Sequence, residues 1–454
     1  MSERTIAAIA TPLGDGGISV IRISGDEAVS VADRCFVAYS GKQLSELVGY
    51  QAAYGRVTDR DGNTLDDAVA LVFLAPKSYT GENVVEISVH GGKVITRQVL
   101  RRVLECGAVL ATGGEFTKRA FLNGKLDLTK AESVMGLISA RNDAAVKISR
   151  GARDGRISRD TEDILNRLLE TAASLSAFAD YPDEDIPNLN VENFSALLSD
   201  CKSKCEKLLS TYDTGRIISE GINCSIIGKP NVGKSTLMNL LCGSERSIVT
   251  DIAGTTRDIV ENVVTVGDIT LNLADTAGIH STGDVVERFG VDKALERIQS
   301  AELLLAVFDS STPLDSDDKQ LLSSIKDKKC IVVLNKTDLE EKIDRNAFDG
   351  LETIEISAKH GLGLDELSQK IGQICQLQML SADDTVLINE RQHDCVRRAY
   401  DAVTSALDAL LMGVTLDAVG VCVDDAIAAL LELSGKRVTN EVCDEIFKRF
   451  CVGK

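Results

Sequence analysis

Short apolar runs alternating with turn residues fill the first 120 positions of the chain. The runs are rich in Val and Ile, a composition typical of strands, and glycine-containing turns separate them. A longer run with helical spacing, Lys93–Cys106, follows the last of them. We therefore expect an α+β domain with strands at Thr5–Ala10, Gly17–Ile23, Ala68–Leu74 and Val84–His90.

From Leu126 onward hydrophobic residues recur every three or four positions, which predicts amphipathic helices. The proline-containing segment Tyr181–Pro187 must interrupt them, because proline removes a helical hydrogen bond. Helical spacing returns after about residue 378, and Gly435 is placed to end one of these later helices.

Between the helical blocks the pattern becomes strand, loop and helix, which is typical of a parallel sheet in a doubly wound α/β domain. A helical block on each side of this segment indicates one helical domain, split in sequence by an inserted α/β domain. The fold class is therefore multidomain. The strands expected in the inserted domain are Ile222–Ile227, Ile269–Ala274, Leu303–Asp309, Cys330–Asn335 and Thr353–Ile356.

Composition supports several folded domains. The chain has 454 residues, which at roughly 150 residues per domain predicts about three. Hydrophobic residues make up 44% and charged residues 26%, values of a folded protein outside the membrane. No stretch approaches the roughly 18 apolar residues of a spanning helix, so we expect no membrane insertion. The first ten residues lack the features of a presequence, which makes the cytoplasm the expected location.

Charge and cysteine usage exclude further classes. The net charge of −19 would repel a polyanion, so any nucleic-acid substrate needs a partner or a local basic cluster. The 12 cysteines include no Cys-x-x-Cys pair, and the four histidines are scattered. Zinc and thioredoxin-type sites are therefore not expected.

The segment Gly228-Lys-Pro-Asn-Val-Gly-Lys-Ser235 fits the phosphate-binding pattern G-x-x-x-x-G-K-[ST]. It follows an apolar run and opens a helical one, a context that distinguishes it from a glycine-rich turn. In such a loop backbone N–H groups surround the phosphates, Lys234 reaches the β and γ oxygens, and the hydroxyl of Ser235 binds magnesium. The sequence therefore predicts a nucleoside triphosphate site.

Three further motifs follow predicted strands of the same domain. Asp275-Thr-Ala-Gly278 places a carboxylate for magnesium and a glycine N–H for the γ-phosphate. In Asn335-Lys-Thr-Asp338 the final carboxylate can accept from guanine N1–H and the 2-amino group, whereas adenine would leave it unpaired. Ser357-Ala-Lys359 supplies backbone to the guanine O6. The predicted nucleotide is GTP.

The catalytic glutamine of switch GTPases is missing, because apolar Ile279 follows the Asp-x-x-Gly motif. Another group must therefore activate the attacking water. The segment Thr250–Asp258 lies where the first switch is expected, with Thr256 able to bind magnesium, and a plain polar loop is its alternative interpretation.

Two motifs lie outside the nucleotide domain. Gly113–Asp127 joins the first domain to the helices, and Cys451-Val-Gly-Lys454 ends the chain. A terminal cysteine is more often inert than catalytic, so residue type alone favours no role for Cys451.

Together these motifs resemble the MnmE (TrmE) family of GTPases, which modify the wobble uridine of certain tRNAs. The resemblance covers essentially the whole chain. Many families share the GTPase motifs, whereas the outer motifs make the match specific. These are Ala10-Thr-Pro-Leu-Gly, Ile21-Arg-Ile-Ser-Gly25, Ser78-Tyr-Thr-Gly-Glu82, His90-Gly-Gly92, Gly114-Glu-Phe-Thr, Asn123-Gly-Lys-Leu-Asp-Leu128 and the terminal Cys-x-Gly-Lys.

The resemblance implies an N-terminal folate-binding and dimerisation domain at residues 1–118, a helical domain at 119–216 and 379–454, and a G domain at 217–378. The family works as a homodimer with the flavoprotein MnmG. It adds a carboxymethylaminomethyl or aminomethyl group to C5 of the uridine, with the one-carbon unit drawn from 5-formyl- or methylene-tetrahydrofolate. Carried over by motif, the folate contacts are Arg22, Glu86, Lys125 and Lys454. Glu82 competes with Glu86, and Cys451 becomes a candidate catalytic residue.

The resemblance also implies potassium-dependent pairing of G domains across the nucleotide, with Asn231, Thr250, Ile252 and Thr255 as ligands. Glu287 matches the family glutamate that positions the water, a solvated helix-face acid being the alternative. The candidate nucleotide contacts are Asn231, Val232, Gly233, Lys234, Ser235, Thr236, Thr250, Asp251, Ile252, Ala253, Gly254, Thr255, Thr256, Asp275, Thr276, Ala277, Gly278, Asn335, Lys336, Thr337, Asp338, Ser357, Ala358 and Lys359.

Two other classes remain open at this point. A GTPase that acts in ribosome assembly would be expected to carry a basic RNA-binding domain. A membrane-remodelling GTPase would be expected to carry basic amphipathic or apolar segments that anchor it to the bilayer. The acidic balance and the split helical domain argue against the first, and no anchoring segment is found for the second.

Overall fold

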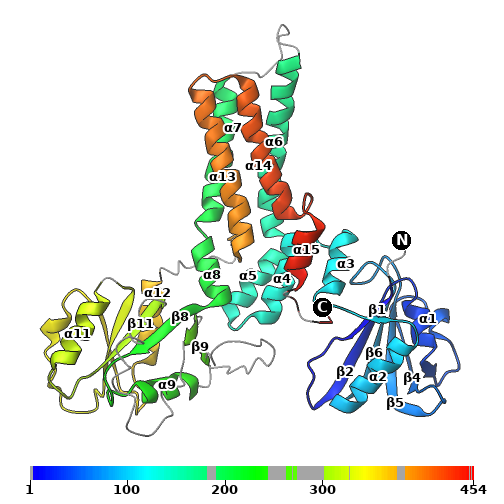
Figure 1. The fold of residues 1–454 in the computed structure, drawn as a ribbon, viewed down its shortest axis with the longest axis horizontal. Helices are drawn as coiled ribbons and strands as arrows, with labels where there is room; N and C mark the ends of the chain where they lie inside the picture. Colours follow the sequence, from blue (N-terminus) through cyan, green and yellow to red (C-terminus); the bar gives the residue numbers. More distant parts are fainter. Residues whose placement is uncertain are drawn as a thin grey trace. The chain divides into compact units, whose positions relative to one another are not determined.

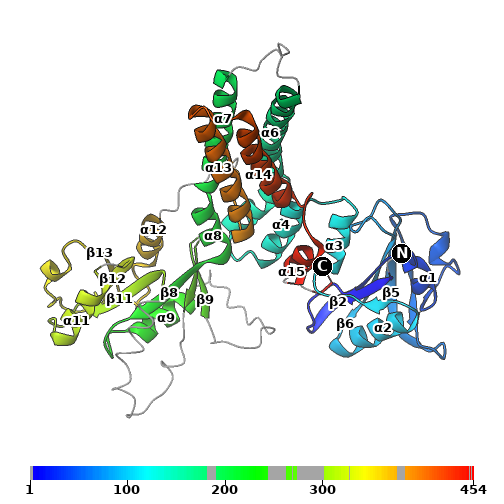
Figure 2. The ribbon, with the colours of Figure 1, turned by 45° about the horizontal axis from the view of Figure 1, so that its top comes forward.

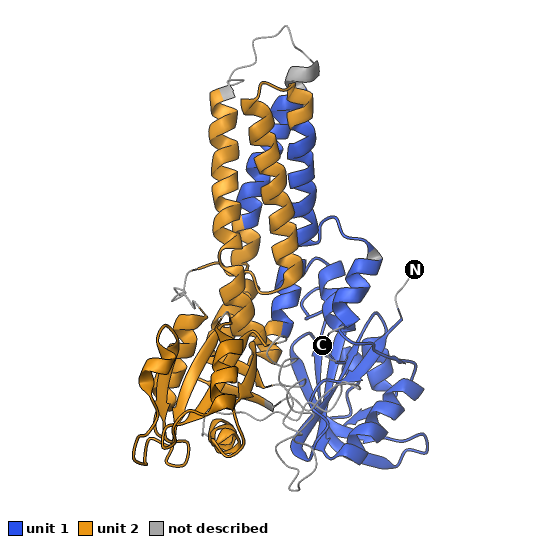
Figure 3. Cartoon of the chain, turned by 60° about the vertical axis from the view of Figure 1, so that its left-hand side comes forward, with its two compact units in different colours: residues 1–135, 161–177, 420–454 blue, residues 136–160, 178–419 orange. Residues whose placement is uncertain are grey.

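The computed structural model describes residues 4–180, 191–243, 262–267, 269–273, 301–326, 328–375, 384–448, 450 and 452–453. The chain forms two compact units, coloured separately in Figure 3. Unit 1 comprises residues 1–135, 161–177 and 420–454, and unit 2 comprises residues 136–160 and 178–419.

Unit 1 contains a seven-stranded sheet with strand order β3-β4-β5-β6-β2-β1-β7. Neighbouring strands are antiparallel, except that β1 and β7 are parallel. The four strands predicted here correspond to β1, β2, β5 and β6, whereas β3, β4 and β7 are additional. The strands are β1 (Ile6–Ile9), β2 (Gly16–Ser24), β3 (Phe36–Ala38), β4 (Gln51–Thr58), β5 (Thr64–Phe73), β6 (Val84–Gly91) and β7 (Val109–Leu110).

Two helices, α1 (Ala28–Asp33) and α2 (Lys93–Glu105), pack against one face of this sheet (Figure 1). Fully buried Val99 and Val103 of α2 share a core with Ile21 and Ile87 of the strands. A single 3-10 turn, η1 (Leu44–Glu46), follows β3. The α+β character of this region is confirmed.

The remaining helices of unit 1 include α3 (Glu115–Leu122) and α15 (Asn440–Lys448), which pack against each other. Phe447 and Phe450 form a small core with Leu128. Gly435 follows α14 (Leu416–Ser434) with a φ of +84°, as the predicted helix end requires. Three helices extend across the bounds of the unit, namely α4 (Leu128–Ser139), α6 (Arg156–Asp180) and α14 (Leu416–Ser434).

Unit 2 contains a six-stranded sheet with strand order β13-β12-β11-β8-β10-β9. It is parallel as predicted, except that β9 runs antiparallel to β10. Gly267, with a φ of +62°, lies in the short turn that makes these two strands a hairpin. The strands are β8 (Ile222–Ile227), β9 (Asn262–Val266), β10 (Ile269–Leu273), β11 (Leu303–Asp309), β12 (Cys330–Asn335) and β13 (Glu352–Ile356).

Some helices of unit 2 (α9, α11 and α12) alternate in sequence with the strands of the sheet, and the others (α5, α7, α8 and α13) precede or follow these strands in the chain. Long helices α7 (Val191–Leu209) and α13 (Glu390–Leu411) lie side by side (Figures 1 and 2). Leu198 and Cys201 of α7 and Val403 of α13 are fully buried. The predicted break at 181–187 lies outside the described residues. The elements are α5 (Asp143–Arg153), α7 (Val191–Leu209), α8 (Tyr212–Glu220), α9 (Lys234–Gly243), α11 (Ser316–Ile325), η2 (Arg345–Phe348), α12 (Leu364–Ile374) and α13 (Glu390–Leu411).

Candidate functional site

The predicted phosphate-binding loop connects β8 to α9, the arrangement that its sequence requires. Gly228 has a φ of +149° and Gly233 a φ of +99°. A Cβ atom at Gly228 would collide with the carbonyl of Val307, and one at Gly233 would collide with the side-chain amide of Asn335. Both positions therefore need glycine, for conformation and for space.

Lys234, the first residue of α9, turns its ammonium group onto this loop. Its Nζ donates to the carbonyl of Gly228 at 2.8 Å and to that of Lys229 at 2.5 Å. Burial lowers the pKa of Lys234. Asn231 adopts a φ of 64°, a left-handed conformation that asparagine tolerates better than most residues. The loop thus holds a partly desolvated cation beside backbone glycines, which fits a polyphosphate.

Asn335 ties the phosphate-binding loop to the predicted base-binding segment. The residue is 3% exposed at the end of β12. Its Nδ2 donates to the carbonyl of Val232 at 2.8 Å, and its Oδ1 accepts from the backbone N–H of Ala358 at 3.0 Å. The first residue of the Asn-x-x-Asp motif is therefore a buried bridge between the phosphate and base ends of the site.

Asp338 lies at the base end of the site. Its Oδ1 accepts from the hydroxyl of Ser357 at 2.6 Å, and Nε2 of His360 is 3.7 Å from Oδ2. The Ser357 hydrogen bond is the main cause of a pKa of Asp338 below its usual value. Lys336, with a φ of 66°, forms an ion pair with Asp309 at 2.5 Å. This pair ties the Asn335–Asp338 motif to the end of β11. The carboxylate is ionised and positioned, as guanine recognition needs.

Unit 1 carries the second candidate site, on the sheet face opposite α1 and α2. Arg22 of β2 pairs with Glu86 of β6 at 2.7 Å, and the two residues lie directly across from each other. The guanidinium lies 5.6 Å from the ring centroid of Tyr79 and 5.7 Å from that of Phe116. Its Nη1 also donates to the carbonyl of Gly453 at 3.1 Å. Arg22, a predicted folate residue, therefore contacts both a second one, Glu86, and the terminal motif.

The chain end is fixed there by backbone contacts. Gly113 forms an antiparallel bridge with Val452. A Cβ at Gly113 would lie 2.7 Å from the carbonyl of Phe450, and one at Gly453 would collide with the carbonyl of Ile9. Glycine at both positions allows the last residues to approach β1 and the start of α3.

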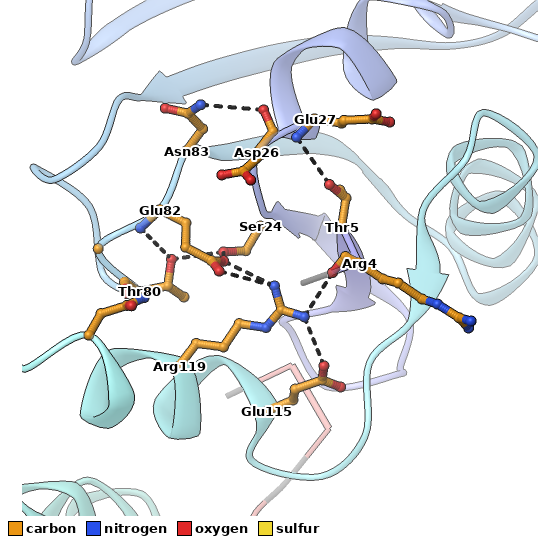
Figure 4. Close-up of polar contacts among 12 residues, drawn as sticks. Arg4, Thr5, Ser24, Asp26, Glu27, Thr80, Glu82, Asn83, Glu115 and Arg119 are labelled. Atoms are coloured by element: carbon orange, nitrogen blue, oxygen red, sulfur yellow. Dashed lines mark hydrogen bonds and ion pairs between the residues drawn. The ribbon is translucent and has the colours of Figure 1, made fainter. Parts of the chain in front are cut away.

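A buried ion-pair network on the neighbouring part of α3 distinguishes the two candidate glutamates (Figure 4). Arg119, 4% exposed, pairs with Glu82 at 3.1 Å and with Glu115 at 3.0 Å. Glu82 also accepts from the hydroxyl of Ser24 at 2.7 Å. Glu82 is thus engaged inside unit 1, whereas Glu86 lies beside Arg22.

The described residues contain no group of three or more His, Cys, Asp or Glu side chains arranged to hold a metal ion. Within the same part of the chain, no helix has the length and apolarity that crossing a bilayer requires.

Comparison with known proteins decides the family. The family model described as the GTP-binding protein TrmE N-terminus matches residues 5–125, and that of the MnmE helical domain matches residues 128–451. A tRNA modification GTPase MnmE of Clostridioides difficile (strain 630) is 38% identical, over all of this chain and 99% of that protein. The chain belongs to the MnmE family.

Two further relatives carry the same name. Proteins with the same name from Geobacillus kaustophilus (strain HTA426) and from Lactococcus lactis subsp. cremoris (strain MG1363) are both 40% identical over 99% of this chain, and over 99% and 98% of their own lengths. Among solved structures, the G domain of the T. maritima FeoB iron transporter is 29% identical over 34% of this chain and 99% of that one, with a TM-score of 0.26.

Several predicted residues of this MnmE-family chain lie outside the described residues, so their placement stays a prediction. They are Thr250, Asp251, Ile252, Ala253, Gly254, Thr255, Thr256, Asp275, Thr276, Ala277, Gly278, Glu287, Cys451 and Lys454.

The structure also adds residues. Tyr79 and Phe116 flank Arg22 and were marked in the sequence only as parts of motifs without a role. Lys125, already predicted from the sequence, donates to the carbonyl of Pro76 at 3.0 Å, in the β5–β6 loop that carries Tyr79.

Proposed function

We propose that this MnmE-family chain is a potassium-dependent GTPase that modifies C5 of the wobble uridine of certain tRNAs together with the flavoprotein MnmG. The group added is carboxymethylaminomethyl or aminomethyl, and its one-carbon unit comes from a tetrahydrofolate. The contact of Arg22 with Gly453 carries this proposal, because it brings the terminal motif to the predicted folate residues. Family membership favours this activity over ribosome assembly or membrane remodelling.

GTP would be held by the two ends of the site in unit 2. Backbone N–H groups of the loop and Lys234 would bind the phosphates, and Asp338 would accept from guanine. Bound magnesium and potassium would supply positive charge beside the phosphates. Magnesium is assigned to Ser235 and Thr256. Potassium is assigned to Asn231, Thr250, Ile252 and Thr255 in paired G domains, with Glu287 positioning the water.

The folate would be held in unit 1, where the residues present fit such a ligand. A pterin and a glutamate tail offer hydrogen-bond partners and negative charge, and Arg22, Glu86 and Lys125 provide cations and a carboxylate. Two aromatic rings beside Arg22 add flat apolar surface. The bound folate would supply the one-carbon unit, while Lys454 would contact it and Cys451 would take part in the chemistry.

A homodimer is supported by the sheet face that α1 and α2 leave open. Tyr39 directly after β3, Tyr54 on β4 and Val69 on β5 are 56%, 60% and 41% exposed, and the two tyrosine rings are 5.2 Å apart. Aromatic residues that gather on an exposed face are typical of protein interfaces. The acidic net charge makes MnmG the expected source of much of the tRNA contact, and the cytoplasm is the proposed location.

Two assays test the proposal on one preparation. GTP hydrolysis is measured in matched potassium and sodium buffers, and wobble-uridine modification is followed by mass spectrometry with MnmG, folate and tRNA present. We expect hydrolysis to be faster in potassium and modification to require hydrolysis. Equal rates in the two buffers refute the potassium role, and hydrolysis without any modified uridine refutes the tRNA activity.

A further inference from the structure

The hairpin of β9 and β10 occupies a particular position in the chain. It separates the predicted switch residues Thr250–Thr256 from Asp275–Gly278, and β10 ends only two residues before Asp275. Rigid secondary elements and hydrogen-bond networks are the parts of a protein that can carry coupling between sites. A residue at the ends of α5 or α8 that contacts this hairpin is in a position to sense the nucleotide.

Asn142 makes such a contact. As the N-cap of α5, its Oδ1 accepts from the backbone N–H of Ala145 at 2.7 Å. The cap fixes the orientation of the side-chain amide, whose Nδ2 donates to Thr270 Oγ1 of β10 at 3.2 Å and to the carbonyl of Ile218 in α8 at 3.3 Å. One side chain therefore joins the start of α5, the last turn of α8 and the hairpin.

Asn272 of β10 makes further hydrogen bonds beside this contact, to α8 and to Arg141. Asn272 Nδ2 donates to the carbonyl of Glu220, the last residue of α8, at 3.0 Å. Its Oδ1 accepts from Arg141 at 3.3 Å. The last carbonyls of a helix have no partner within the helix. At the end of α8, Asn272 of β10 therefore binds the carbonyl of Glu220, and Asn142, the N-cap of α5, binds that of Ile218. Thr270 is 1% exposed, so the contact with Asn142 is shielded from competing water.

We propose that Asn142 is a positioning residue that couples the nucleotide state of the β9–β10 hairpin to α5 and so to the modification reaction. It is not among the residues assigned to the nucleotide or to the folate. The inference rests on the proposed GTP-driven tRNA modification and adds the residue through which the GTPase domain acts on the helical segment.

The test uses Asn142→Ser. Serine caps a helix about as well as asparagine, but it has no amide to reach Thr270 or Ile218. Asn389→Ser is the matched control, because Asn389 caps α13 with nearly the same backbone angles, φ −147° and ψ 164°, and its side chain accepts from Gln392 N. Thr270→Val removes the hydroxyl at nearly constant volume and breaks only the hairpin side of the junction.

Two readouts are taken on the full chain. The first is the ratio of modification rate to GTP hydrolysis rate. The second is hydrogen exchange of Asp143–Arg153, compared between GDP and GDP with aluminium fluoride. We expect Asn142→Ser to keep hydrolysis within about twofold, lower modification by about fivefold or more, and abolish the nucleotide-dependent difference in α5. Thr270→Val should do the same, and the double variant should be no worse than the stronger single one.

An unchanged ratio and an unchanged exchange difference in Asn142→Ser overturn the inference. So does an equal loss in Asn389→Ser, which would assign the effect to helix capping, or a parallel loss of hydrolysis, which would assign it to the G-domain fold. Parent enzyme that modifies tRNA equally well without GTP refutes the proposed function itself, and this outcome is seen before any variant is made.

Discussion

Replacing Asp338 by Asn changes how the site reads the base. The hydroxyl of Ser357 donates to one oxygen of Asp338 at 2.6 Å, and the asparagine carbonyl can keep this bond. The NH₂ group then lies where the second carboxylate oxygen accepted from guanine. Two donors of the base, N1–H and the 2-amino group, lose their charged acceptor.

The size of the effect follows from these two bonds. A hydrogen bond to a charged group contributes about 1.5–3 kcal/mol, so losing two weakens GTP binding by about 3–6 kcal/mol. At about 1.4 kcal/mol per factor of ten, the Kd for GTP rises by a factor of about a hundred to ten thousand. Xanthine nucleotides should gain, because their 2-oxo group accepts from the new amide.

Equilibrium binding of fluorescent GTP and XTP analogues to both proteins measures this exchange. Asp344→Asn is the control: Asp344 caps η2 by accepting from Asn346 N, and asparagine caps equally well while removing the same charge from the same domain. Asp338→Asn protein that binds GTP as tightly as the parent would show that Asp338 does not read the base. An equal loss in Asp344→Asn would assign the effect to net charge.

Three further results are expected. Glu287→Ala should lower the kcat of GTP hydrolysis at least about tenfold with little change in GTP affinity, because the carboxylate acts in the transition state, and a loss confined to affinity contradicts this role. Deletion of residues 452–454, or the substitution Cys451→Ser, should abolish uridine modification while GTP hydrolysis stays near normal. Full modification in both variants would refute the role of the chain end. Arg22→Ala should weaken binding of 5-formyl-tetrahydrofolate by calorimetry, since about 1.5–3 kcal/mol per charged hydrogen bond is lost, and unaltered folate affinity would place the ligand elsewhere.

Strands with strong local patterns were predictable. The continuous apolar runs of β11 and β12 are typical of strands buried on both faces, and the bounds of both strands match the prediction. Strand β4 has an open face that carries Tyr54 and Arg56, so its sequence lacks an apolar run. Its position depends on pairing with β5, which no local signal encodes.

The same limit applies to the sites. The phosphate-binding loop is contiguous, so its glycines and Lys234 could be assigned from spacing alone. The contact of Arg22 with Gly453 joins residues 431 positions apart, and only the resemblance of the outer motifs linked them. Asn142 had no signal at all, because an asparagine before a helix is an ordinary N-cap and its second role depends on where β10 lies.

The central claim, GTP-driven modification of the wobble uridine, is tested most directly in a strain that lacks its own MnmE-family protein. Wobble nucleosides are measured by mass spectrometry after complementation with this chain or with its Lys234→Ala variant, which loses the phosphate-binding ammonium. The account predicts that the C5 side chain returns with the parent chain and stays absent with the variant. Unmodified uridine with the folded parent chain, or full modification with Lys234→Ala, would contradict it.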